Sequence, residues 1–211
     1  MSPAISKIKL EKLKELYIEK GLSMLDVSKS IGVSIDAVAY AMRKHDIPRR
    51  SLKEASKRSF ENKEMTFKKK EIKGIKKITT EIILSMLYWG EGFKGHEDSK
   101  LTTVDFANSD PEMIRLYINS LRSMYDLDEK KLRVLLYCYS NQDISSLIDH
   151  WSKLTKIPKT QFSKPYIKSN SQANIKAMKY GLVHIRYNDK KLLIEIKNLI
   201  ECVRNKYAPV E

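Results

Sequence analysis

The stretch Ile83-Leu-Ser-Met-Leu-Tyr-Trp-Gly-Glu-Gly92 carries the strongest local pattern in the chain. Apolar, small and aromatic residues occupy nearly every side of the helix that it predicts, which is typical of a helix packed against another helix. Its one charged residue, Glu91, stands between Gly90 and Gly92, which remove side-chain bulk and permit a tight helix end. Because burying an unpartnered carboxylate is costly, we expect Glu91 to have a partner, and a hard divalent cation such as Mg²⁺ would serve.

This stretch resembles the LAGLIDADG motif of homing endonucleases. The motif's two leucines, the small residue before its acid, the acid and the final glycine fall on Leu84, Leu87, Gly90, Glu91 and Gly92. Two positions depart, since Met86 replaces the motif's first glycine and Trp89 replaces its first aspartate. The resemblance implies a divalent metal ligand and catalytic role for Glu91, with two such helices side by side and their acids sharing metals above the scissile phosphates. The alternative is a common apolar helix with a solvated glutamate at its end.

The composition predicts a polyanionic partner. The 211 residues carry a formal net charge of +14, and nucleic acid is the commonest polyanion for a soluble chain; an anionic membrane surface is the competing interpretation. No run approaches the roughly 18 apolar residues of a spanning helix, and lysines from Lys7 onward interrupt the start where a signal peptide would lie. Because the cysteines and histidines are scattered, we expect no structural zinc and a cytoplasmic, nucleoid-associated protein.

Residues 1–50 are similar to a helix-turn-helix domain. Ser23 and Ser34 stand where N-caps are needed, and Gly32 supplies the backbone freedom of the turn between the second and third helices. A plain three-helix bundle without a DNA role is the alternative. The expected helices span Ile8 to Lys20, Met24 to Ile31 and Ile35 to about Lys44.

The third of these helices would enter the major groove of DNA with its N-terminal residues. The two arginines after Pro48 are placed to reach a phosphate or an adjacent minor groove. Few of the residues are Arg or Asn, so we expect modest base selectivity from this domain. The candidate DNA contacts are Ser34, Asp36, Ala37, Tyr40, Arg43, Arg49 and Arg50.

Residues 51–78 are predicted to be a basic linker. Residues 51–77 carry a net charge of +6, the sharpest positive density in the chain, with little apolar periodicity. We expect a connector, part of it helical, that lies along phosphates through Lys68, Lys69 and Lys70; a segment that is merely soluble is the alternative.

The remaining residues, 79–211, contain an internal repeat. Val104–Asp110 and Val183–Asp189 align at a constant offset of 79 residues, and each is a strand of alternating pattern followed by an Asp that can cap an amphipathic helix. With the helices and strands around them, the copies give helix, strand, strand, helix twice, in halves of about 79–140 and 141–211. The chain is therefore expected to be α+β, and the resemblance implies a pseudo-twofold LAGLIDADG-like domain with an antiparallel, saddle-shaped sheet in a monomer rather than a homodimer. A chance match between two strand–helix units is the alternative.

Alternation along the expected strands separates core residues from outward ones. If Val183, Ile185 and Tyr187 face the core, then His184 and Arg186 face out, and the strands near 132–140 and 160–168 are treated in the same way. The outward candidates for DNA contact are Arg133, Lys164, Lys168, His184 and Arg186.

Metal-assisted cleavage of DNA needs carboxylates to hold the cations. The second half's helix ends without an acid near Ile157, so the two halves of one chain supply half a metal site. Glu97 and Asp98 are expected in a polar turn, solvated. The function predicted from the sequence is a double-stranded DNA-binding protein, with a regulatory or mobile-element role, whose cleavage activity is weak or lost. An active Mg²⁺-dependent endonuclease is the first alternative, for which two chains could pair their Glu91 helices, and an RNA-associated basic protein is the second.

Overall fold

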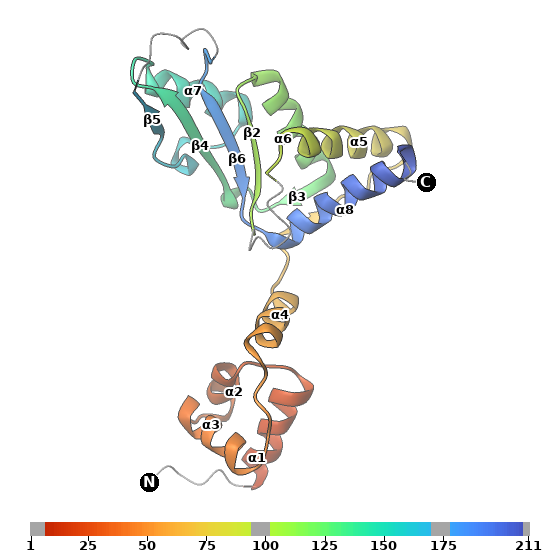
Figure 1. Cartoon of the computed structure of the whole chain (residues 1–211), viewed down its shortest axis with the longest axis vertical. Helices are drawn as coiled ribbons and strands as arrows, with labels where there is room; N and C mark the ends of the chain where they lie inside the picture. Colours follow the sequence, from red (N-terminus) through yellow and green to blue (C-terminus); the bar gives the residue numbers. More distant parts are fainter. Residues whose placement is uncertain (1–6, 94–101, 170–177, 209–211) are drawn as a thin grey trace. The chain divides into compact units, whose positions relative to one another are not determined.

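The computed structural model describes residues 7–93, 102–169 and 178–208, and it divides the chain into two compact units, Met1–Glu64 and Met65–Glu211 (Figure 1). The first is called unit 1 and the second unit 2 below.

From residue 7 to Glu64, unit 1 is built from helices and the turns between them. Ser23 and Ser34 accept hydrogen bonds from the backbone N–H groups of Asp26 and Ala37, which confirms both predicted N-caps. Gly32 ends the second helix in the left-handed conformation at φ 71°, which favours glycine. The elements are α1 (Lys7–Lys14), a π-helical turn η1 (Glu15–Glu19), α2 (Met24–Ile31), α3 (Ile35–Lys44) and α4 (Leu52–Asn62).

Residues 51–78, where a partly helical basic linker is expected, contain helix α4 and a short strand after it. Ser51 and Glu54 form a reciprocal capping box that starts α4 within unit 1. Beyond Glu64, strand β1 (Phe67–Lys69) pairs with β3 (Tyr125–Leu127), and Phe67 is buried in the core of unit 2. The boundary between the units therefore falls near Glu64. The capping box at Ser51 keeps the basic residues of α4 in unit 1, and the buried ring of Phe67 keeps the lysines after it in unit 2.

Unit 2 is an α+β domain around a four-stranded sheet in the order β2-β6-β4-β5. The β2–β6 and β6–β4 pairs are antiparallel, but β5 runs parallel to β4. The sheet is therefore mixed, which corrects the expectation of an antiparallel sheet. The predicted strand over 160–168 was too long, because a 3-10 turn η3 (Lys159–Gln161) precedes it and Pro165 cannot donate to a ladder. The strands are β2 (Val104–Asn108), β4 (Leu132–Tyr139), β5 (Tyr166–Lys168) and β6 (Leu182–Tyr187).

The helices of unit 2 pack on one face of this sheet, and α5 lies against both α6 and α8 (Figure 1). That face carries the core, with Leu132, Val134 and Leu136 of β4 all at 0% exposure. Asp110 and Asp189 cap α6 and α8, as the repeat predicted. The helices are α5 (Gly74–Glu91), α6 (Pro111–Met124), α7 (Ile144–Thr155) and α8 (Lys190–Tyr207).

The two repeated strands are direct neighbours in the sheet. Phe106 pairs with Ile185, its equivalent 79 residues later, and Val104 pairs with Tyr187. The two antiparallel strands are therefore related by a local twofold axis that passes between Phe106 and Ile185. The twofold relation does not hold for the whole of the two expected halves. Strand β4 was assigned to the first half, but it pairs with β6 of the second. The strand predicted near Phe93–Gly95 lies largely outside the described residues, although Gly92 forms a bridge to Phe106.

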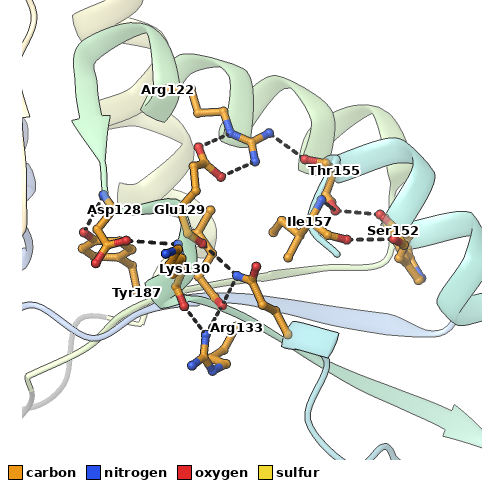
Figure 2. A network of polar contacts seen from close by, with 12 residues as sticks. Arg122, Asp128, Glu129, Lys130, Arg133, Ser152, Thr155, Ile157 and Tyr187 are labelled. Atoms are coloured by element: carbon orange, nitrogen blue, oxygen red, sulfur yellow. Dashed lines mark hydrogen bonds and ion pairs between the residues drawn. The ribbon is translucent and has the colours of Figure 1, made fainter. Parts of the chain in front are cut away.

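A polar network joins α6 to the end of α7 in the helical layer (Figure 2). Arg122 of α6 donates two hydrogen bonds, of 2.8 and 2.7 Å, to the carboxylate of Glu129 in the 3-10 turn η2 (Glu129–Lys131). The same guanidinium donates to the carbonyl of Thr155 at 2.6 Å, which satisfies one of the open carbonyls at the end of α7. Charge-assisted bonds of this kind fix the positions of α6, η2 and α7 relative to one another.

Candidate nucleic-acid interface

The face of the sheet turned away from the helices is called the open face. Strand pairing gives it regular rows: Arg133, Arg186 and Asp105 lie across β4, β6 and β2, and Leu135, His184 and Ala107 form the next row. All of these side chains except Asp105 are half-buried or exposed. Further along, Tyr137 pairs with Tyr166, and Tyr139 with Lys168. The alternation predicted for β4 and β6 is confirmed, since Val183, Ile185 and Tyr187 are at most 1% exposed.

Four of the five outward residues predicted from the sequence are thus together on the open face, namely Arg133, Lys168, His184 and Arg186. Arg133 also donates from its guanidinium to the carbonyls of Lys130 at 2.6 Å and Leu132 at 2.7 Å. Lys164 is exposed but belongs to the irregular segment before β5, because the expected long strand does not form there.

Asp105 organises the open face where β2 meets β6. Its carboxylate is 2.8 Å from Nδ1 of His184 and accepts a hydrogen bond of 2.8 Å from Nε of Arg186. Only 9% of Asp105 is exposed. Sequence reasoning missed this residue, although the repeat contained a signal, since Asp105 and His184 occupy equivalent positions 79 residues apart.

Tyr88 of α5 connects the end of its helix to this cluster. Its hydroxyl donates to the carbonyl of Phe93 at 3.1 Å and accepts from the N–H of Asp105 at 3.3 Å. Burial raises the pKa of Tyr88 to about 12, so it stays a neutral donor. A Cβ on Gly92 would lie 2.5 Å from the Tyr88 ring, so the close approach requires glycine at this position.

Glu91 ends α5 at the rim of the same cluster. With Gly90, Asp105, His184 and Arg186 it lines an open hollow of about 380 Å³, called the basic hollow. Glu91 is exposed and forms no hydrogen bond or ion pair with the described residues, which corrects the expectation of a dry, packed surround. The reason is that α5 packs on one side only: Leu84 and Tyr88 are at 0% exposure, while Met86 is 49% and Trp89 40% exposed.

The donor set tests whether a resident Mg²⁺ fits here. Within the described ranges no three His, Cys, Asp or Glu side chains are close enough to hold a metal ion. Both oxygens of Asp105 are already engaged, which leaves Glu91 as the unengaged carboxylate of the basic hollow. Glu97 and Asp98 lie outside the described residues. One carboxylate suits Mg²⁺ only when other oxygens, such as phosphates, complete its shell, so these residues of one chain do not form a resident metal site.

The three candidate lysines of the expected linker have other roles. Lys69 forms an ion pair with Glu195 of α8, and Lys70 donates to the carbonyl of Arg122 at 2.8 Å. Lys68 lies opposite Asp126 in the β1–β3 pair. Lys68 and Lys69 therefore belong to strand β1, and Lys70 follows it directly, so all three lie in a segment held by contacts within unit 2.

In unit 1 most of the predicted contact residues are exposed at the surface of α3 and after it. Ser34, Asp36 and Arg43 are exposed, and Tyr40 is 54% exposed. Ala37 was wrongly expected at the surface, since it is 5% exposed in the first turn of α3, the helix that packs against α2.

The paired arginines after Pro48 differ from each other. Arg49 is exposed. Arg50, in contrast, lies over the Tyr17 ring at 4.0 Å and donates to the carbonyls of Gly21 at 2.9 Å and Leu22 at 3.2 Å. A contact of Arg50 with DNA would compete with these bonds, because its guanidinium joins the segment after α3 to the η1–α2 turn.

No protein-family model matches this sequence, and no curated protein or solved structure is similar enough to count as a match. Among the helices of the described residues, none combines the length and the apolar character that crossing a bilayer requires.

Proposed function

We propose that this chain is a double-stranded DNA-binding protein that uses the open face of unit 2 and helix α3 of unit 1. The observation that carries the proposal is the open face itself, where Arg133, Arg186 and Lys168 stand on a sheet whose other side is mostly apolar and buried. Strands can lie in the major groove, with their outward side chains toward bases and phosphates. The formal charge of +14 supports a polyanion as the partner.

Unit 1 adds a second element of the proposal. Three residues, Gly32 to Ser34, join α2 to α3, and the first turn of α3 exposes Ile35 and Asp36. A short turn between two helices, the second with an exposed N-terminal end, is the arrangement of helix-turn-helix readers. From the LAGLIDADG resemblance of α5, and although β4 pairs outside its expected half, we further propose that unit 2 is homing-endonuclease-like, with a regulatory or mobile-element role near the nucleoid.

We also propose that the protein pairs as a homodimer through α5, in preference to the monomer expected from the sequence. The outer face of α5 carries Ile75, Ile78, Ile82, Met86 and Trp89, spaced three or four residues apart along one side of the helix. Ile75 is 83% and Ile78 45% exposed, and a Cβ at Gly90 would meet nothing within 4 Å. A twofold interface sets one patch against its own copy, and an uncharged helix face with a small residue lets two backbones approach closely.

This pairing favours a second candidate function, a Mg²⁺-dependent DNA endonuclease. If the twofold axis of this dimer runs along α5, the two copies of Glu91 lie at the same end of the helix pair, each beside a basic hollow. Two carboxylates together with DNA phosphates could hold a cation, which one chain alone does not. We retain binding with weak or lost cleavage as the primary proposal, because Asp105 is already engaged by His184 and Arg186.

A plasmid-library experiment tests these functions. We expect the purified protein to bind plasmid DNA, with affinity falling steeply as salt rises because phosphate contacts release counterions. Binding without cuts in Mg²⁺ or Mn²⁺ supports the primary proposal. Site-specific cuts that Glu91→Gln abolishes establish the endonuclease. Failure to bind duplex DNA at low salt, or tighter binding of structured RNA at matched salt, overturns both.

The dimer has its own measurement. Light scattering after gel filtration should give twice the chain mass, and Met86→Glu should give the single-chain mass with an unchanged circular dichroism spectrum. Ile167→Glu, at a residue of similar exposure (49%) on β5, is the matched control and should stay dimeric. A wild-type protein that remains monomeric at high concentration contradicts this pairing.

A further inference from the structure

Three aromatic rings are in contact along the open face. The centroids of Tyr166 and Tyr137 are 5.1 Å apart, and those of Tyr137 and His184 are 5.0 Å apart. They come from β5, β4 and β6, so they form a row that crosses the strands. Tyr166, at the edge of the sheet, is 53% exposed. These three residues are called the aromatic row.

The aromatic row differs from the tyrosines that serve the core. Tyr187 lies on the opposite side of β6, is 0% exposed, and donates from its hydroxyl to the carbonyl of Thr66 at 2.6 Å. The side chains of Tyr137 and Tyr166, in contrast, have no hydrogen-bond partner among the described residues. Packing among the described residues therefore accounts for Tyr187, whereas it leaves the hydroxyls of Tyr137 and Tyr166 without a hydrogen-bond partner there.

Cationic side chains lie on two sides of the aromatic row. Lys168 is exposed and two residues beyond Tyr166 on the same face of β5. Arg186 is two residues beyond His184 on the same face of β6. Rings between cations match a ligand with a flat apolar surface and negative charges on either side, which describes a nucleobase with its flanking phosphates. A fully paired duplex hides the faces of its bases, so only an unstacked base can use the rings.

We propose that the aromatic row binds an unpaired nucleobase, so that the protein prefers DNA with an extruded or mismatched base over the same duplex fully paired. This inference rests on the proposed DNA-binding function and names the substrate class of the same face. Stacking on an aromatic side chain is sequence-tolerant, so the preference follows the unpaired state and not the base identity.

The test compares two labelled duplexes that differ only by a single bulged 2-aminopurine. We expect the wild-type protein to bind the bulged duplex about tenfold more tightly and to quench the 2-aminopurine emission, as stacking does. Tyr166→Ala should remove most of the preference, while Tyr166→Phe, which keeps the ring, should retain it. Tyr207→Ala is the matched control, since Tyr207 is 58% exposed on α8, in the helical layer.

The outcomes separate this inference from the function on which it rests. Equal affinity for the two duplexes, or an equal loss for both with Tyr166→Ala, overturns the aromatic row as a base site and leaves duplex binding standing. Binding to neither duplex at low salt overturns both proposals. Tighter binding of the matching single-stranded RNA than of the bulged DNA also overturns the inference. Unchanged tryptophan emission of each variant checks that unit 2 is folded.

Discussion

The two sides of β4 serve different purposes, core packing and surface exposure, although their residues alternate along one short strand. On the covered side Leu132, Val134 and Leu136 are at 0% exposure and determine how the helices pack. On the open side Arg133 and Tyr137 stand beside residues of other strands and contribute little to that packing. The comparison teaches that stability and binding are separated by a single step along the chain, so substitutions at neighbouring positions should have different consequences.

The largest difference is expected between two adjacent leucines of β4. Leu136→Ala should lower the free energy of unfolding of unit 2 by about 3 kcal/mol, because it leaves a cavity in a packed core. Leu135→Ala, at a half-buried position on the open face, should cost below about 1 kcal/mol. Urea unfolding followed by tryptophan fluorescence measures both, since Trp89 and Trp151 are in unit 2. Equal losses would mean that the two faces are not distinct in energy.

A similar contrast is expected between Arg50 and Arg49 in unit 1. Arg50→Ala removes charge-assisted bonds to the carbonyls of Tyr17, Gly21 and Leu22 and should destabilise unit 1 by about 2 kcal/mol. Arg49→Ala should leave stability nearly unchanged and weaken DNA binding. Far-ultraviolet circular dichroism follows both units and tryptophan fluorescence follows unit 2, so an Arg50→Ala loss should be visible in the first signal alone. A loss in both signals would show that the two units unfold together.

The role of the open face in DNA binding can be tested at Asp105. Asp105→Asn removes a negative charge and frees Arg186 for phosphates, so we expect the affinity for duplex DNA to rise about tenfold at low salt. Asp126→Asn removes the same charge from an exposed position on β3 and is the matched control. Fluorescence anisotropy gives both affinities, and a rise of equal size in the control would show that only net charge matters.

The smallest effect is expected at an exposed charge cluster in unit 1. Hydrogen bonds from Lys20 and Lys12 lower the pKa of Glu15 from 4.5 to about 2. Because the folded pKa is depressed, the contribution of Glu15 is present above pH 4.5 and is lost as the pH falls towards 2. Exposed pairs contribute little, so Glu15→Gln should flatten only slightly the fall of the unit 1 melting temperature over this range. Circular dichroism melts at several pH values measure this melting temperature. A steeper fall in the variant would contradict a lowered pKa for Glu15.

Local signals in the sequence predicted the parts of the fold that local physics determines. Ser23, Ser34, Asp110 and Asp189 cap the helices that they were expected to cap, because a cap needs only its own next residues. The alternation in β4 and β6 was equally readable, since one buried face fixes the phase of a strand.

Features that depend on distant partners were not predictable in the same way. Arg50 was expected at DNA because nothing near it in the sequence points to Tyr17, 33 residues earlier. The parallel edge strand β5 and the pairing of β1 with β3 depend on which segments meet in the folded chain. At the candidate site, outward residues could be identified from alternation, but the engagement of Asp105 by His184 and Arg186 required the register of two strands.

The edge formed by β5 has a consequence for how copies of this protein meet. An exposed sheet edge invites pairing with another chain, and natural proteins discourage it with short strands, prolines and lysines. β5 has three residues, begins after Pro165 and ends at Lys168. Growth of the sheet from one molecule into the next is therefore disfavoured, so protein stored at high concentration should resist fibril formation at this edge.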